Sequence, residues 1–187
     1  MTAQLTIRDA TPDDIADITA IYAPSVTDGT ASFELEPPNE AEMARRMQAI
    51  VGAGYPYLVA ELGGDVVGYA YASAYRTRPA YRWSVENTVY ISPMTQRTGA
   101  GRTLLQALIA ACVAKGYRQM IAVIGDSGHS ASIGLHRALG FTFCGTIHSV
   151  GYKHGRWLDS VIMQRQLGPG DTSPPSDGVA AAGSQPQ

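Results

Sequence analysis

A short segment rich in glycine and arginine has the residue types needed to bind a phosphate group. It reads Gln96-Arg97-Thr98-Gly99-Ala100-Gly101-Arg102. This segment lies between a predicted strand and a strongly apolar predicted helix. The start of a helix has unpaired N–H groups and the positive end of the helix dipole, and glycine lets the backbone approach phosphate oxygens closely. The segment is therefore predicted to bind an anion, with Arg97 and Arg102 adding charge; the alternative is a plain turn.

Two other phosphate-binding motifs do not fit this segment. A P-loop needs Gly-Lys-Ser/Thr, whereas Gly101 is followed by Arg102 and Thr103, and the spacing also differs. A dinucleotide-binding fingerprint needs a third glycine where this chain has Leu104. The anion therefore has to be identified from other residues.

A carboxylate precedes the glycine segment on the same predicted strand. Glu86 stands between Val85 and the apolar run 89–91. A carboxylate beside apolar groups has a raised pKa and accepts a proton more readily at neutral pH. Glu86 is therefore a candidate general base; the alternative is an edge-strand glutamate that faces solvent.

The histidines and cysteines do not indicate a metal site. The sequence has no histidine pair at ligand spacing and no Cys-x-x-Cys, so we expect no metal. His148 and His154 are expected at the surface. Cys112 and Cys144 lie in apolar segments and are expected to be buried, reduced thiols, which favours a cytoplasmic protein.

The elements that position these residues alternate between strand and helix patterns. Helices are predicted from Pro12 onward and over residues 39–51, 101–115 and 130–139. Strands are predicted over residues 5–8, 57–61, 66–73, 86–91, 119–124, 141–147 and 157–166. A Gly63-Gly64-Asp65 turn joins the second and third strands, and a connection containing glycine and lysine joins the last two. The pattern is typical of an α/β or α+β sandwich.

Composition predicts one domain with a short tail. The chain has 187 residues, of which 45% are apolar, and this is enough for one hydrophobic core over residues 1–168. Residues 169–187 are rich in proline, glycine, serine and alanine, so we expect a disordered tail.

Charge and hydropathy exclude several classes of partner. The net charge is −2, and residues 1–168 carry as many basic as acidic residues, which argues against binding nucleic acid or an anionic membrane. The longest near-apolar stretch, residues 104–114, is too short to span a bilayer. The first residues lack a basic head followed by an apolar block, so we expect no signal peptide.

The order of several motifs resembles that of the GNAT acetyltransferase superfamily. Gln96-x-x-Gly99-x-Gly101 resembles its acetyl-CoA pyrophosphate loop, and residues 132–141 resemble its last helix with a Gly-Phe ending. Residues 30–34, 81–90, 124–127 and 151–159 resemble the phosphinothricin and methionine sulfoximine N-acetyltransferase branch. The resemblance covers about residues 5–167. It implies a mixed sheet of about six to seven strands, about four flanking helices, and two strands that splay at the coenzyme site.

The resemblance also implies a reaction and a partner. Members of this branch transfer acetyl from acetyl-CoA to the α-amino group of a small amino acid, by direct attack in a ternary complex. The implied biological role is detoxification of phosphinothricin, methionine sulfoximine or methionine sulfone. The branch forms homodimers in which the second subunit helps to line the acceptor pocket.

Site residues follow from the matching positions. The implied catalytic residues are Glu86 and His136. The implied coenzyme-binding residues are Val89, Ile91, Arg97, Thr98, Gly99, Ala100, Gly101, Arg102, Thr103 and His129, of which Val89 and Ile91 act through backbone N–H groups. The implied substrate-binding residues are Phe33, Arg76, Arg78, Tyr81, Trp83 and Asn87. Arginine suits a substrate carboxylate because its planar fork matches both oxygens.

Two histidines differ from the wider superfamily pattern. His136 occupies a position where many members carry a tyrosine that is thought to protonate the coenzyme thiolate. An imidazole can donate to sulfur or act as the base, and the sequence does not separate these roles. His129 occupies a position that usually carries asparagine, which puts its contact with the pantetheine arm in doubt.

Two other functions remain open at this point. One keeps acetyl transfer but changes the acceptor to another amino acid, a polyamine or a protein N-terminus; the arginine-rich loop disfavours a cationic acceptor. The other is a non-catalytic acyl-CoA-binding module, which would need neither Glu86 nor His136.

Overall fold

The protein is described by a computed structural model whose described residues are 4–175. Its strands are β1 (Leu5–Asp9), β2 (Tyr57–Leu62), β3 (Asp65–Ala74), β4 (Ser84–Ile91), β5 (Gln119–Gly125), β6 (Thr142–Lys153) and β7 (Arg156–Gln166). Its α-helices are α1 (Ile15–Thr27), α2 (Glu40–Gly52), α3 (Ala100–Ala114) and α4 (Ser130–Ala138). Three short 3-10 helices are η1 (Pro12–Asp14), η2 (Pro79–Tyr81) and η3 (Pro93–Thr95).

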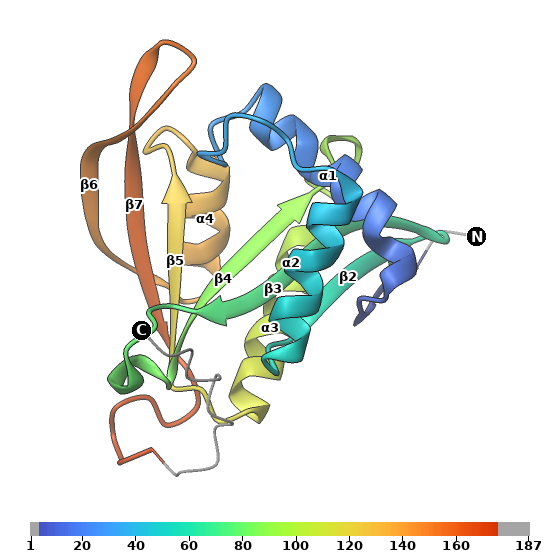
Figure 1. Cartoon of the computed structure of the whole chain (residues 1–187). Coiled ribbons are helices and arrows are strands. Elements are labelled where there is room, and N and C mark those ends of the chain that lie inside the picture. The colour runs from blue at the N-terminus through green and yellow to red at the C-terminus, as the bar shows by residue number, and fades with distance from the viewer. Residues whose placement is uncertain (1–3, 176–187) are drawn as a thin grey trace.

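The seven strands form one mixed sheet in the order β1-β2-β3-β4-β5-β7-β6. Neighbouring strands are antiparallel except β4 and β5, which are parallel. Their pairing starts at Ser84 with Gln119 and ends at Asn87 with Ala122, although both strands continue. Figure 1 shows β4 and β5 diverging toward their carboxyl ends. This divergence opens the middle of the sheet.

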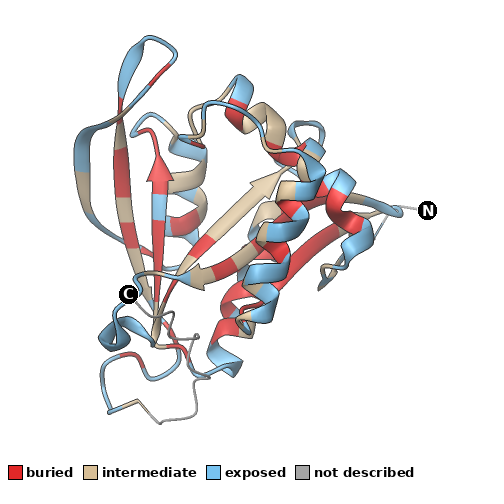
Figure 2. Ribbon diagram, in the orientation of Figure 1, coloured by how far each residue is buried: buried red, intermediate tan, exposed pale blue. Residues whose placement is uncertain are grey.

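Helices cover both faces of the sheet (Figure 1). On one face, α1 and α2 enclose a core around Ile18, Val26 and Tyr69. On the other face, α3 and α4 pack on a larger core that includes Leu104 and Met120. Figure 2 shows buried residues, in red, on the helices and on the central strands, whereas most of β6 is exposed. The two cores hold the central strands β3, β4 and β5 from both sides.

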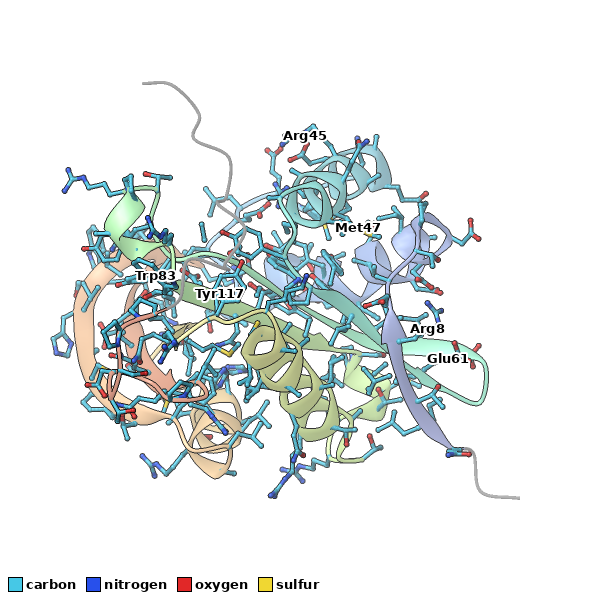
Figure 3. All side chains as sticks on the ribbon, turned by 90° about the horizontal axis from the view of Figure 1, so that it is seen from below. Arg8, Arg45, Met47, Glu61, Trp83 and Tyr117 are labelled. Carbon is cyan, nitrogen blue, oxygen red and sulfur yellow. The ribbon has the colours of Figure 1, made fainter. Side chains whose placement is uncertain are left out.

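Local sequence explains where several elements begin and end. Thr11 and Asp14 form a reciprocal capping box at the start of η1, and Arg8 contacts both Asp14 oxygens at 2.8 Å. Arg8 also bonds Glu61 on β2, which ties the first strand to its neighbour (Figure 3). Gly64, with φ of 100°, permits the tight turn between β2 and β3.

The structure corrects two expectations. Cys144 is exposed, not buried, because β6 is the edge strand of the sheet and one of its faces is open; Cys112 is buried as expected. The connection predicted between the last two strands is mostly strand, since β6 continues to Lys153 and only a turn at His154 and Gly155 remains. The continuous hairpin requires an irregularity between Ile147 and Gly151.

The first part of the predicted tail contacts the domain. Residues 169–171 form a turn, and the Arg118 guanidinium donates to the carbonyl groups of Gly170 at 3.0 Å and Pro174 at 2.9 Å. The remainder of the predicted tail, residues 176–187, lies outside the described residues.

Candidate active site

A cavity of about 910 Å³ lies where β4 and β5 diverge. Its walls come from β4, the start of α3, the end of β5, α4 and residues 31–34. Eleven predicted site residues line it: Phe33, Glu86, Asn87, Val89, Ile91, Arg97, Gly99, Gly101, Arg102, His129 and His136. The cavity therefore brings together the glycine segment, the candidate base and His136 from separate parts of the chain.

One end of the cavity is made by the backbone at the start of α3. Gly99 precedes the helix with φ of 89°, a left-handed conformation that disfavours any other side chain. A Cβ atom at Gly101 would lie 3.3 Å from Ile91 Cγ1. Small residues therefore keep the first turn of α3 open to the cavity, and its N–H groups, which have no carbonyl partner within the helix, suit an anion.

Three predicted coenzyme residues of this segment lie outside the cavity lining. Ala100 is buried in the core behind the turn. The Thr98 hydroxyl donates to the Thr95 carbonyl at 2.7 Å, and the Thr103 hydroxyl donates to the Gly99 carbonyl at 3.3 Å. Their side chains stabilise the turn, so a contact with the coenzyme would have to use their backbone groups.

Glu86 is half-buried on β4 and faces the cavity. Burial raises the pKa of Glu86 above the usual value of 4.5, and the positive charge of Arg76 partly opposes this shift. The structure thus excludes the fully exposed alternative for Glu86. A carboxylate with a raised pKa in a cavity can accept a proton from a bound amine, directly or through water.

His136 is 2% exposed and is held by hydrogen-bonding groups at both ring nitrogens. Nδ1 lies 2.8 Å from the Ser132 carbonyl oxygen, and Nε2 lies 3.0 Å from Asn87 Oδ1. The Asn87 amide nitrogen donates to the Ile121 carbonyl at 3.0 Å, so its oxygen must face the imidazole. Both ring nitrogens therefore face acceptors, while burial lowers the pKa of His136.

This arrangement gives Asn87 a role that its sequence position did not reveal. Asn87 is the last β4 residue paired with β5, and its buried amide links β5 to the His136 ring. The resemblance implied a substrate contact for Asn87, which lines the cavity, and that contact stays a prediction. The structure places Asn87 as a support for His136.

Four predicted substrate residues, all within the described residues 4–175, lie outside the cavity lining: Arg76, Arg78, Tyr81 and Trp83. They belong to the segment between β3 and β4. This segment lies at the end of the sheet where the parallel strands β4 and β5 are still paired (Figure 1). Trp83 packs against the core that contains Tyr117 (Figure 3), and Arg82 stacks 3.9 Å from the Trp83 ring centroid. The arginine and aromatic residues of this segment therefore pack on one another rather than forming a wall of the cavity.

Arg76 is the member of this group with an electrostatic connection to the site. Its guanidinium carbon lies 5.1 Å from the centroid of the Tyr75 ring, and its charge lowers the pKa of Glu86. Arg76 therefore acts on the candidate base across space, although it does not line the cavity.

Sequence reasoning missed a second carboxylate at the cavity. Glu34 lines the cavity beside Phe33. Its carboxylate accepts from Arg46 at 2.6 Å and from the Tyr22 hydroxyl at 3.0 Å. These partners come from α2 and α1, so the sequence near Glu34 gave no signal that it is held in place.

Other predictions about the site concern metals and surface histidines. Within residues 4–175, no three His, Cys, Asp or Glu side chains are grouped so that they could hold a metal ion. His148 and His154 are exposed, as predicted. His129 precedes α4 and lines the cavity, with its backbone N–H bonded to the Asp126 carbonyl at 3.0 Å.

Comparison with known proteins identifies the family. Residues 7–162 match the family described as "Acetyltransferase (GNAT) domain". The chain belongs to the GNAT acetyltransferase family. The predicted resemblance, the fold and the enzyme class are thereby confirmed.

Several characterised GNAT relatives cover nearly the whole chain. The chain is 54% identical to phosphinothricin N-acetyltransferase of Alcaligenes faecalis, over 91% of this chain and 86% of the relative. It is 42% identical to L-methionine sulfoximine/L-methionine sulfone acetyltransferase of Pseudomonas paraeruginosa, over 90% and 98%. Within the GNAT family, the chain is therefore similar to the phosphinothricin and methionine sulfoximine acetyltransferases.

A solved GNAT structure has the same fold. It is a phosphinothricin acetyltransferase from Sinorhizobium meliloti in complex with acetyl-CoA, with a TM-score of 0.91, 52% identity and coverage of 97% of both chains. The predicted use of acetyl-CoA agrees with that complex. No helix within residues 4–175 is long and apolar enough to cross a membrane.

Proposed function

We propose that this GNAT acetyltransferase transfers acetyl from acetyl-CoA to the α-amino group of a small amino acid of the phosphinothricin, methionine sulfoximine or methionine sulfone type. The observation that carries the proposal is the half-buried Glu86 carboxylate, which faces the cavity between β4 and β5. The names of the relatives supply the acceptor class.

Acetyl-CoA would enter with its diphosphate at the start of α3. The N–H groups of the first helical turn, the open backbone at Gly99 and Gly101, and the guanidinium groups of Arg97 and Arg102 all suit this anion. The same cavity continues to Glu86, so a coenzyme held at the turn can direct its thioester toward the carboxylate. Val89 and Ile91 line the path and would offer backbone N–H groups to the thioester carbonyl.

The reaction would proceed by direct attack. Glu86 removes a proton from the acceptor ammonium, and the nitrogen lone pair forms a bond to the thioester carbonyl carbon. The resulting tetrahedral oxyanion collapses and breaks the C–S bond, which gives the amide and the coenzyme thiolate. The nitrogen still carries two protons after the attack and loses one of them as the amide forms; this proton balances the one that the coenzyme thiolate takes up. The first proton, held by Glu86, is released to solvent.

His136 would assist the leaving sulfur. Because burial lowers the pKa of His136, its ring is mainly neutral near neutral pH and carries one N–H. The Ser132 carbonyl and Asn87 Oδ1 compete for that N–H. When it lies on Nε2 it can be shared between Asn87 Oδ1 and the thiolate, which is a hydrogen-bonding role. Glu86 is assigned as the base because its carboxylate is half-buried and faces the cavity, whereas both ring nitrogens of His136 already face acceptors.

We further propose a homodimer that uses the β6–β7 face. Five large apolar side chains on these strands are at least half exposed: Phe143, Ile147, Val150, Tyr152 and Trp157. β6 is an edge strand, so it offers both these side chains and unpaired backbone groups to a second copy of the chain. Light scattering after size exclusion should give twice the chain mass.

The proposed biological role is detoxification in the cytoplasm. Acetylation removes the basicity and the positive charge of the α-amino group. An enzyme that recognises the charged amino group of the free amino acid would then no longer bind the compound. An exposed free thiol at Cys144 suits a reducing compartment. The balanced charge of residues 1–168 supports a small-molecule acceptor over nucleic acid or a membrane surface.

Release of coenzyme thiol over a panel of amines tests the proposal. Acetyl-CoA is supplied with phosphinothricin, methionine sulfoximine, methionine sulfone, a polyamine or a peptide with a free N-terminus. We expect thiol release with the first three compounds. Release only with the polyamine or the peptide would assign another acceptor, and binding of acetyl-CoA without release for any amine would indicate an acyl-CoA-binding module.

A further inference from the structure

Residues 29–34, here called the roof segment, lie between α1 and α2 in the chain, and residues 31–34 form one wall of the cavity. Phe33 is the aromatic member of this segment and lines the cavity. The segment passes beside the end of β5 and the β6–β7 hairpin (Figure 1). The position of the Phe33 ring therefore depends on what lies behind the roof segment.

Two glycines lie directly behind the roof segment. A Cβ atom at Gly151 on β6 would be 2.6 Å from both Cδ2 and Cε2 of Phe33. A Cβ atom at Gly125 on β5 would be 2.7 Å from the Thr30 carbonyl oxygen and 3.1 Å from Phe33 Cε1. Neither glycine has a positive φ, so both are needed for space and not for backbone conformation.

The two positions differ in what they contact. At Gly125 the nearest atoms are backbone oxygens of Thr30 and Ala31, so an added side chain would displace the main chain. At Gly151 all three nearest atoms belong to the Phe33 ring. Gly151 is therefore the position from which the ring alone can be moved.

The backbone of the roof segment is anchored close to Gly151. Lys153 lies two residues further along β6, on the same side of the strand, and is 4% exposed. Its ammonium donates to the Ser32 carbonyl at 2.8 Å and the Ser25 carbonyl at 3.4 Å. Thr30 also donates to Asp126 at 2.8 Å, and Arg156 bonds the same carboxylate at 2.5 Å. These contacts hold the main chain of the roof segment, so a displaced Phe33 ring would move without its backbone.

We infer that Gly151 sets the size of the acceptor end of the cavity, because its lack of a side chain leaves the space that the Phe33 ring occupies. With the backbone held by Lys153 and Asp126, a ring displaced from Gly151 moves toward the cavity. Gly151 is thus a specificity-determining residue that selects the length of the acceptor side chain. This inference rests on the proposed function, because it assumes that an amino acid occupies the cavity beside Phe33.

The test compares Gly151→Ala with Gly145→Ala. Both glycines lie on β6, but a Cβ atom at Gly145 meets nothing within 4 Å. For Gly151→Ala we expect the KM for methionine sulfone to rise about 10-fold. The KM for the shorter S-methylcysteine sulfone should rise less, and the KM for acetyl-CoA should stay the same. Gly145→Ala should leave all three constants unchanged.

A second substitution distinguishes the contact between residue 151 and the Phe33 ring from a general loss of structure. Phe33→Leu in the Gly151→Ala background removes the ring atoms that meet the new methyl group. We expect it to restore selectivity for methionine sulfone over the shorter acceptor to within about 3-fold of the parent. Equal constants for Gly151→Ala and Gly145→Ala, or no rescue by Phe33→Leu, would overturn the inference while leaving the proposed function intact. A parent that acetylates no amino acid would overturn both.

Discussion

The two ends of the cavity are built in different ways. At the coenzyme end, one continuous segment supplies a left-handed glycine, an open helix start and two arginines. At the acceptor end, Glu86 comes from β4, whereas Phe33 and Glu34 come from the roof segment and are placed by contacts with α1, α2 and β6. A site made by backbone conformation is local in sequence, whereas a site made by side chains depends on tertiary packing.

The largest expected effect breaks the acceptor end without changing the coenzyme end. Glu86→Gln keeps the shape of the side chain but removes the base, so we expect kcat to fall by about 10²- to 10⁴-fold. The KM for acetyl-CoA should be unchanged. Steady-state kinetics between about pH 6 and 9 check this, with exposed Glu36→Gln as the control. Equal turnover of parent and Glu86→Gln across this range would rule out Glu86 as the base.

The next effect breaks the coenzyme end alone. Gly99→Val forces a β-branched residue into a backbone with φ of 89°, which strains the turn by about 1–2 kcal/mol. We expect the KM for acetyl-CoA to rise about 10-fold, with a smaller change in the KM for the acceptor.

Gly64→Val is the matched control for this strain. Gly64 has φ of 100° in the β2–β3 turn, outside the cavity lining. It should lower thermal stability to a similar extent but leave the KM for acetyl-CoA unchanged. If both variants weakened acetyl-CoA capture equally, the effect would come from general destabilisation, and the turn at Gly99 would lose its proposed role.

The smallest effect sharpens the electrostatics of the acceptor end. Arg76 lowers the pKa of Glu86, so Arg76→Ala should raise that pKa further. A base must be deprotonated to act, so the acid limb of the kcat profile should move to higher pH. Arg78→Ala, in the same segment, should leave the limb in place. A shift in the opposite direction for Arg76→Ala would contradict the assigned interaction.

Much of the fold follows from local sequence signals. Thr11, Pro12 and Asp14 mark the first helical turn, and Gly63 and Gly64 mark the first hairpin. The exposure of Cys144 and the length of β6 could not be predicted, because both follow from the place of β6 at the edge of the sheet. The residues of a strand do not show whether a second strand or solvent lies beside it. The order of strands in the sheet is likewise a tertiary property.

The candidate site divides in the same way. The glycine turn was predictable because its chemistry depends on residues adjacent in the chain. Glu86 was a candidate from its apolar neighbours in the strand, but only the fold decides that it faces the cavity and not solvent. Trp83 and Arg78 were predicted to line the acceptor pocket, but aromatic stacking and core packing hold their segment at the paired end of β4. Lys153 and Gly151 gave no local signal, since their partners lie more than a hundred residues away in the roof segment.

A crystal structure with both acetyl-CoA and methionine sulfone bound tests the central claim most directly. We expect the diphosphate against the N–H groups that follow Gly99, and the acceptor amine within hydrogen-bonding reach of Glu86, directly or through one water. A diphosphate bound away from the start of α3, or an amine whose path to Glu86 is blocked, would contradict the proposed mechanism.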